Sequence, residues 1–395
     1  MNLTKLVIAL LFLIIPFSMI FSDSLDENPM EEGADVITQA TPDWDNKKKV
    51  VKSDEKKKEK EDDDIGWVLF PVAFYSSDTN FGFGASAIIF KDYYKDEYIS
   101  KSDSLALVLF YTLRNQLLNA NVGNVYWDNA NWHWAGKLLF SKYPTDFYGI
   151  GNYTKLSNEE VFEPFTFEFE NDINYRLWRA LYGGITLIQG YYKLLDKKDD
   201  GLADQYFSLK KREGFISGLG IKLNYDSRND SFFPTEGIKG EVLYQYFPTW
   251  LGSQYEFSKF EFDIRGYIPL IFDSVLAVQA LFTAVEGDAP LSFLPALGSK
   301  DLLRGYSGSR FRDNIYIAGQ VELRIPIWWR FGAVLFFGTG KVQNEMMEFF
   351  FKDLKYAGGF GVRFQLNSKK RINFRFDMGF TPEGYNFYFN ILEAF

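Results

Sequence analysis

Hydrophobic residues alternate with polar or small residues over many segments of this chain. Residues 371–380 show the pattern most clearly. One parity carries Ile372, Phe374, Phe376, Met378 and Phe380, and the other carries Arg371, Asn373, Arg375, Asp377 and Gly379. Because successive side chains of a β-strand point to opposite faces, this pattern predicts a strand with one apolar and one polar face.

About sixteen such segments follow one another over residues 66–395, each close to the length that a tilted membrane strand requires. Their centres are Pro71, Ala85, Val108, Ala120, Leu138, Phe167, Ile185, Gly220, Leu243, Phe262, Val278, Gln320, Val334, Gly361, Phe374 and Phe389. We therefore predict an all-β fold, a transmembrane antiparallel β-barrel of about sixteen strands over residues 65–395. Alternation alone also fits a soluble β-sandwich, and the girdle-like Trp and Tyr residues at strand ends favour the barrel.

The connections between these segments support the same topology. The long polar connections fall on one side if the strands are numbered in order, at residues 142–164, 194–213, 286–314 and 343–353. The other side carries mostly short turns, such as those at Asp273 and at Trp328-Trp329, although the connection at residues 91–103 is long. Long outer loops and short periplasmic turns are typical of bacterial outer-membrane barrels.

Composition and charge narrow the class of protein. Aromatic residues make up 19% of the chain, and mean hydropathy is -0.18. Only the N-terminal residues form a long apolar run, which excludes a bundle of membrane-spanning helices. The net charge of -9 argues against a nucleic-acid partner. The absence of cysteine excludes disulfides and thiolate chemistry.

The N-terminal residues predict export followed by a linker. Lys5 precedes an apolar run over residues 6–21, so we expect residues 1–22 to be a signal peptide, with an uncleaved anchor helix as the alternative. Residues 23–64 hold few apolar side chains and a dense run of charges, which predicts a disordered periplasmic linker.

Catalytic chemistry finds little support in the sequence. His133, the single histidine, lies between Trp132 and Trp134, and its parity points it to the lumen, away from both tryptophans. The tryptophans suit membrane-interface anchors. No clustered metal ligands are evident, and we expect no enzyme activity, no catalytic residue, no metal and no cofactor.

The central loop, residues 286–314, contains the motif Leu303, Arg304, Gly305 and Tyr306. Four other stretches accompany it in order, namely residues 147–152 (FYGIGN), 225–237, 321–326 (VELRIP) and 389–395 (FNILEAF). Together these motifs resemble those of the BamA/TamA family of outer-membrane β-barrels, the bacterial surface antigen family, over residues 66–395. The resemblance is to a member without POTRA domains, because only the charged linker precedes the barrel.

The resemblance implies roles for particular residues. Arg304 is expected to fold back into the barrel and pair with inner-wall carboxylates, Glu322 first and Asp353 as a second candidate; a guanidinium suits such bidentate pairing. Gly338 departs from the family, whose members usually carry an aspartate there. The chain end, with Phe389, Ile391 and Phe395, looks like the signal read by the barrel-assembly machinery.

By the same resemblance, the barrel is expected in the bacterial outer membrane, where it assists insertion of proteins or lipids through a seam between the first and last strands. Pro71 supports a seam, because it lacks an N–H for a ladder bond. Expected partners are outer-membrane lipids, the barrel-assembly machinery during biogenesis, unfolded outer-membrane proteins and a separate periplasmic protein. The alternative is a passive pore or a structural surface antigen with a loop-plugged lumen.

Overall fold

The computed structural model describes residues 66–76, 79–95, 100–230, 233–346, 352–367 and 372–395. The predicted signal peptide and linker lie outside the described residues. No helix among the described residues is long and apolar enough to cross a membrane.

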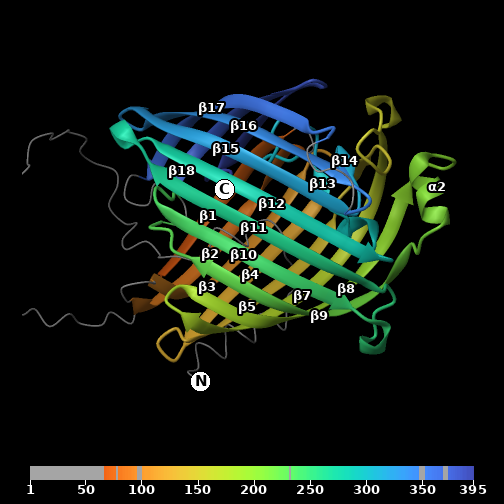
Figure 1. The fold of residues 1–395 in the computed structure, drawn as a ribbon, viewed down its shortest axis with the longest axis horizontal. Helices are drawn as coiled ribbons and strands as arrows, with labels where there is room; N and C mark the ends of the chain where they lie inside the picture. The colour runs from red at the N-terminus through yellow and green to blue at the C-terminus, as the bar shows by residue number, and fades with distance from the viewer. Residues whose placement is uncertain (1–65, 77–78, 96–99, 231–232, 347–351, 368–371) are drawn as a thin grey trace, which may run out of the picture.

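Sixteen long strands and the three-residue strand β6 form one antiparallel sheet that closes into a barrel (Figure 1). The first eight long strands are β1 (Gly66–Ser76), β2 (Asn80–Lys95), β3 (Ser100–Thr112), β4 (Leu117–Trp127), β5 (Trp132–Lys142), β7 (Glu160–Trp178), β8 (Leu181–Lys197) and β9 (Glu213–Asp226). The other eight are β10 (Gly237–Phe247), β11 (Phe257–Pro269), β12 (Val275–Gly287), β15 (Ile315–Trp328), β16 (Phe331–Gln343), β17 (Lys355–Asn367), β18 (Ile372–Thr381) and β19 (Gly384–Ile391). Each predicted segment centre falls in a different long strand, so the predicted strand number and order are confirmed.

Short elements lie in the connections. They are β6 (Thr145–Phe147), η1 (Leu156–Asn158), α2 (Leu202–Ser208), η2 (Thr249–Leu251), η3 (Ile271–Asp273), η4 (Leu291–Phe293), β13 (Ala296–Leu297) and β14 (Phe311–Arg312). Helix α2 and the pair β13–β14 lie at the same end of the barrel, on the right in Figure 1, which we call the loop end. The opposite end, the turn end, carries the turn between β4 and β5 and the turn between β15 and β16.

One predicted connection is wrong. Residues 91–103 do not form a long loop, because β2 extends to Lys95 and β3 begins at Ser100. Lys91 pairs in register with Asp103 and Lys95 with Ser100, so the ladder continues through most of this polar stretch. The polar side chains of residues 91–103 gave no sign of the strands, because a β-ladder is held by backbone hydrogen bonds, which do not depend on side-chain polarity.

The two faces of the barrel wall differ in chemistry. On β15, Val321 is exposed on the outer face, whereas Glu322 and Arg324 on the inner face are buried. Other strands repeat the pattern, with exposed apolar side chains such as Ile264 and Leu335 outside. An apolar exterior around a charged interior is the pattern of a transmembrane barrel and the reverse of a soluble sandwich.

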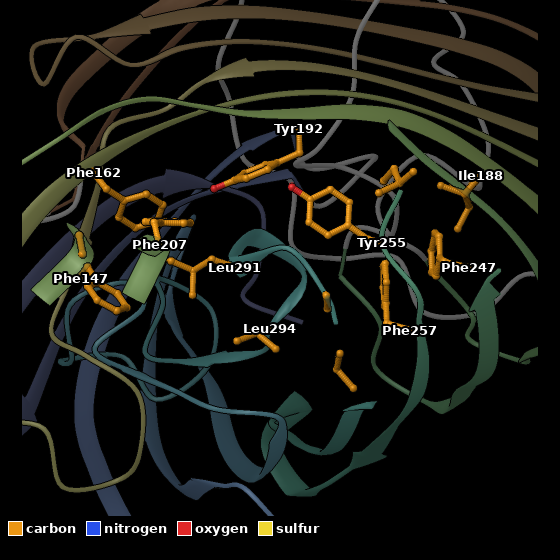
Figure 2. Close-up of a cluster of buried hydrophobic side chains, with 14 residues drawn as sticks. Phe147, Phe162, Ile188, Tyr192, Phe207, Phe247, Tyr255, Phe257, Leu291 and Leu294 are labelled. Atoms are coloured by element: carbon orange, nitrogen blue, oxygen red, sulfur yellow. The ribbon is translucent and has the colours of Figure 1, made fainter. Parts of the chain in front are cut away.

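Aromatic side chains fill part of the lumen at the loop end (Figure 2). Phe162 of β7 and Tyr192 of β8 point inward and pack with Phe207 of α2 and with Leu291 of η4. Phe247 stacks on Phe257 from the neighbouring strand, with ring centroids 4.1 Å apart. The connections therefore fold over this side of the lumen and give the barrel an apolar core at one end.

Candidate functional site in the lumen and at the seam

The connection from β12 to β15 folds into the barrel and carries the sequence motif with it. Leu303 and Tyr306 are buried in a cluster with Phe311 from the same connection and Val342 from β16. Gly305 adopts a φ of +122°, a backbone conformation that a side chain would strain. This packing leaves Arg304 with no exposed side-chain surface, so its charge needs partners inside the protein.

Two carboxylates from the barrel wall pair with the two terminal nitrogens of Arg304. Its Nη2 lies 2.6 Å from Glu322 Oε2 and its Nη1 lies 2.7 Å from Asp377 Oδ2. The guanidinium also stacks over the Phe336 ring, 3.6 Å from the centroid. Glu322 belongs to β15, Phe336 to β16 and Asp377 to β18, so one loop side chain links three strands.

Further arginines extend this pair into a network. Arg324 donates to Glu322 at 2.9 Å, and Arg363 donates to Asp377 at 2.6 Å and to Glu393 at 2.7 Å. The charges alternate within the network, so the buried carboxylates and guanidinium groups offset each other's desolvation. A buried pair of this kind is costly to break, because removing one partner leaves the other charge buried without a partner.

Asp301 adds a contact from the loop to β18. Its Oδ1 accepts a hydrogen bond from Arg375 Nη2 at 2.8 Å, and its Oδ2 lies 2.7 Å from Lys300 Nζ. Burial raises the pKa of Asp301, but Lys300 and Arg375 outweigh burial and lower its pKa from 3.8 to about 2. The Asp301 carboxylate is therefore ionised at neutral pH and holds the loop to the wall.

The loop backbone contacts the last two strands closely. Gly305 N–H donates to the Tyr388 hydroxyl at 3.0 Å, and that hydroxyl donates to the Tyr306 carbonyl oxygen at 3.1 Å. Asn386 Nδ2 donates to the Gly305 carbonyl oxygen at 2.8 Å. A Cβ at Gly379 would overlap the Arg304 carbonyl oxygen, so glycine allows this approach.

Arg310 makes a second attachment, which the sequence analysis missed. It donates to both carboxylate oxygens of Glu383, each at 2.7 Å, and to Thr154. Its guanidinium lies over the rings of Tyr148 and Phe311. Glu383 lies in the turn between β18 and β19, so the loop also holds the tip of the final hairpin.

Of the two expected partners of Arg304, the structure places Glu322 against it and Asp353 elsewhere. The Asp353 carboxylate lies 4.0 Å from Lys352 Nζ, and its backbone oxygen accepts from Asn152. The second carboxylate is Asp377, whose lumen-facing parity was visible in the sequence but which β18 brings close only through barrel closure. At Gly338, where the family usually carries an aspartate, a Cβ would lie 3.7 Å from Leu303 Cγ of the loop.

The C-terminal residue also joins the inner wall. Phe395 is buried with Tyr267, Val275 and Ala277, and its main-chain oxygen accepts from Arg324 Nη2 at 2.6 Å. Phe389 stacks on Phe374, 5.5 Å between centroids, and Ile391 pairs in register with Phe374. The chain end is thus linked to Glu322 through Arg324.

The seam between β1 and β19 is narrow. Among the described residues, the two strands share one register pair, Tyr75 with Phe389. By contrast, β1 and β2 share eleven register pairs, and β18 and β19 share eight. Tyr75 and Phe389 each lie near the C-terminal end of their strand. Because the strands are antiparallel, β1 and β19 overlap only over these end residues. Pro71 is exposed in the part of β1 beyond this pair.

His133 faces the lumen, as its parity predicts. Its Nε2 lies 2.9 Å from Asn124 Oδ1, and its ring stacks on Tyr126 at 4.3 Å. The surrounding wall carries Lys137, Asp172 and other polar residues around a cavity on β4 to β10. This cavity lies on a different part of the wall from the Arg304 network.

Comparison with known proteins agrees with this architecture. Residues 100–395 match the Omp85 superfamily domain, and no curated protein matches the chain. The fold is similar to BamA from Haemophilus ducreyi lacking POTRA domains 1–3, with a TM-score of 0.59 and 14% identity, covering 83% of this chain and 70% of that chain.

Two CdiB structures are also similar. CdiB from Acinetobacter baumannii has a TM-score of 0.52 and 11% identity, covering 83% of this chain and 59% of that chain. CdiB from Escherichia coli has a TM-score of 0.55 and 9% identity, covering 82% of this chain and 62% of that chain. This chain therefore spans less than two thirds of either CdiB chain. The sixteen-stranded barrel and the matched domain together show that the chain belongs to the Omp85 superfamily.

Proposed function

We propose that this chain is an exported outer-membrane barrel that assists insertion of other outer-membrane proteins, or of lipids, through the seam between β1 and β19. The observation that carries the proposal is the single register pair, Tyr75 with Phe389. Membership of the Omp85 superfamily supports the same assignment.

Among the described residues, most of the β1 edge that faces β19 has no register partner there. A fully paired strand satisfies its N–H and C=O groups on both sides, and an edge strand presents a free row of them. Residues of β1 before Ala73 pair with β2 but lie beyond the end of β19, because Tyr75 opposite Phe389 places Ala73 opposite Ile391, the last residue of β19. Because unpaired backbone groups are costly in a bilayer, an incoming strand that paired with this edge would be favoured.

Opening the seam is expected to cost little. Separating β18 from β19 would break a ladder of eight register pairs, whereas separating β1 from β19 breaks one. A client strand can therefore enter at the seam without competing against a long ladder. The proposal includes unfolded outer-membrane proteins and a separate periplasmic protein as partners, and the barrel-assembly machinery as the agent of this chain's own insertion.

Client folding in liposomes tests this proposal. The chain has no cysteine, so Tyr75→Cys with Phe389→Cys introduces one disulfide across the seam. Directly opposed residues hold their Cβ atoms about 4.5–5.5 Å apart, near the range that a disulfide needs. We expect the barrel to accelerate folding of a small outer-membrane protein, and the oxidised variant to lose this effect until reductant restores it.

A matched cross-link controls for the disulfide itself. Tyr244→Cys with Phe260→Cys joins β10 to β11, which are already fully paired, and should leave the acceleration unchanged. No acceleration by the reduced barrel, or equal acceleration by the oxidised seam variant, would contradict the proposal.

A second candidate function is a structural barrel with a blocked lumen. The observation that favours it is the filling of the lumen by the Arg304 loop and by the aromatic cluster at the loop end. Planar-bilayer conductance tests it: deletion of residues 303–312 should open a channel if the loop is only a plug. An insertase would instead lose client folding in the same deletion.

A further inference from the structure

The connection between β9 and β10, residues 227–236, is longer than the other connections at the turn end. A hydrogen bond holds its two ends together, because Asn229 Oδ1 accepts from the Thr235 N–H at 3.0 Å. Gly237 follows with a φ of +105°, and a Cβ there would overlap the Ser227 carbonyl oxygen. The described ends of this connection are therefore fixed to each other.

The connection reaches the inner wall of a strand that is not its neighbour. Pro234 is buried, and its carbonyl oxygen accepts from Arg324 Nη1 at 3.4 Å. The Phe233 ring lies 5.5 Å from the Arg324 guanidinium. Arg324 belongs to β15, which β11 and β12 separate from β10 in the sheet. Residues 233–234 therefore extend past the ends of β11 and β12 to contact β15.

Arg324 collects contacts from three parts of the chain. Besides Pro234, the main-chain oxygen of Phe395 accepts from it at 2.6 Å and Glu322 Oε1 at 2.9 Å. The rings of Tyr267 and Phe395 lie 5.7 Å and 5.6 Å from its guanidinium. Its side chain is only 2% exposed, so these protein groups take the place of water around the charge.

Glu322 connects Arg324 to the loop. One carboxylate oxygen, Oε1, accepts from Arg324, and the other, Oε2, accepts from Arg304 Nη2 at 2.6 Å. The Glu322 side chain has no exposed surface, so water cannot replace either guanidinium if one of them moves. A displacement of Arg324 must therefore change the pairing of Glu322 with Arg304.

We propose that Arg324 is a positioning residue that couples the β9–β10 connection to the loop that carries Arg304, so that a periplasmic protein bound to this connection changes how firmly the loop is held. When residues 233–234 move away, Arg324 loses an acceptor and a ring contact, and Glu322 is no longer fixed in the position that meets Arg304. The periplasmic partner rests on the proposed function, whereas the coupling is a property of the barrel alone.

Amide exchange of the purified full-length barrel, without a client, tests the coupling. We expect Phe233→Ala to make exchange at Gly305 and Tyr306 about two- to fivefold faster, the effect of losing one cation–π contact. Glu236→Ala is the matched control in the same connection, because its side chain is exposed, and should leave that exchange unchanged. In an Arg324→Gln background, Phe233→Ala should add no further increase, because the coupling is already broken.

A reverse measurement needs no substitution at Arg324. A coupling free energy acts equally in both directions, so Arg304→Ala should speed exchange of the Thr235 amide, which donates to Asn229. The Asn131 amide, which donates to the Asp128 carbonyl oxygen in the turn between β4 and β5, should not change.

Three results would each overturn the proposal: unchanged exchange at Gly305 in Phe233→Ala, an equal increase with and without Arg324, or unchanged exchange at Thr235 in Arg304→Ala. No client takes part in these measurements, so a failure of client folding in liposomes would reject the proposed function and leave the coupling standing.

Discussion

The two strands that meet at the seam are held very differently. On one side, β19 contacts the loop through Tyr388 and Asn386, and its neighbour β18 contacts the loop through Asp377 and Arg375. On the other side, β1 pairs with β2 and meets β19 at one register pair. The seam therefore has a fixed edge at β19 and a free edge at β1.

This asymmetry has a physical cause. Strand β18 carries Asp377, which pairs with Arg304, and β19 is flanked by Glu383 and Glu393, which pair with Arg310 and Arg363. Moving β18 or β19 would therefore separate guanidinium groups from carboxylates inside the protein. Strand β1 contains no charged residue, so moving it separates no such pair. We therefore infer that seam opening displaces β1, while β19 and the loop act as the rigid wall.

Removing Arg304 should loosen the fixed edge more than any other single substitution. In Arg304→Ala, Glu322 and Asp377 lose their shared partner, and loss of one member of a buried ion pair costs about 3–5 kcal/mol. We expect normal export, faster proteolysis within residues 288–314 and faster amide exchange in β18 and β19. Arg212→Ala is the matched control, because its side chain is half exposed. Unchanged protease sensitivity of the Arg304 variant would contradict the assignment.

Loss of the C-terminal side chain should have the next largest effect. Phe395 is buried against Tyr267, and truncation of a buried phenylalanine costs about 3–5 kcal/mol at a fully packed site. Removing the residue also removes the main-chain oxygen that accepts from Arg324. We expect a lower outer-membrane yield, measured by quantitative immunoblotting of membrane fractions. Phe395→Tyr is the control, because it keeps the ring and the main-chain oxygen. Equal yields of the truncated and unmodified proteins would show that neither the buried ring nor the hydrogen bond to Arg324 is needed for assembly.

A substitution at Gly379 should push the loop off the fixed edge. The added Cβ of Gly379→Ala would overlap the Arg304 carbonyl oxygen, and such overpacking costs about 1–3 kcal/mol. Gly319→Ala is a suitable control, because the nearest atom to its added Cβ is 3.5 Å away. Thermal unfolding should distinguish the two variants, and equal melting temperatures would show that the loop adapts freely.

Weakening the pair between Arg310 and Glu383 should have the smallest effect on the fixed edge. Glu383→Gln removes the charge opposite Arg310, but the contacts of Arg310 with Thr154 and with two aromatic rings remain. Arg310 is buried and Glu383 is 29% exposed, so we expect a loss of stability of about 1–3 kcal/mol, less than in Arg304→Ala. Amide exchange should rise in the β18–β19 hairpin and stay unchanged in β15. A rise as large as that in Arg304→Ala would show that Arg310, and not Arg304, holds the fixed edge.

The contrast between the two carboxylates of Arg304 shows how far sequence reasoning reaches. Glu322 was predictable, because it lies on the lumen-facing parity of the strand that follows the loop. Asp377 shares that parity on β18 but lies 73 residues from Arg304, and nothing local indicates that the two meet. Asp353, the second candidate, lies beside Lys352 instead, because the local sequence does not determine which part of the wall the loop packs against.

Local alternation was enough to predict the strand number and which residues share a face, because side-chain direction in a strand depends only on the neighbouring residues. The choice of a barrel over a sandwich needed a second signal from the sequence, the Trp and Tyr residues at the strand ends. The partner of Arg304 on β18, the attachment of Arg310 to Glu383 and the single register pair at the seam could be found only from the folded barrel. These features depend on how far each strand is shifted against the next. The shift accumulates around the whole barrel and becomes visible only where the first strand meets the last.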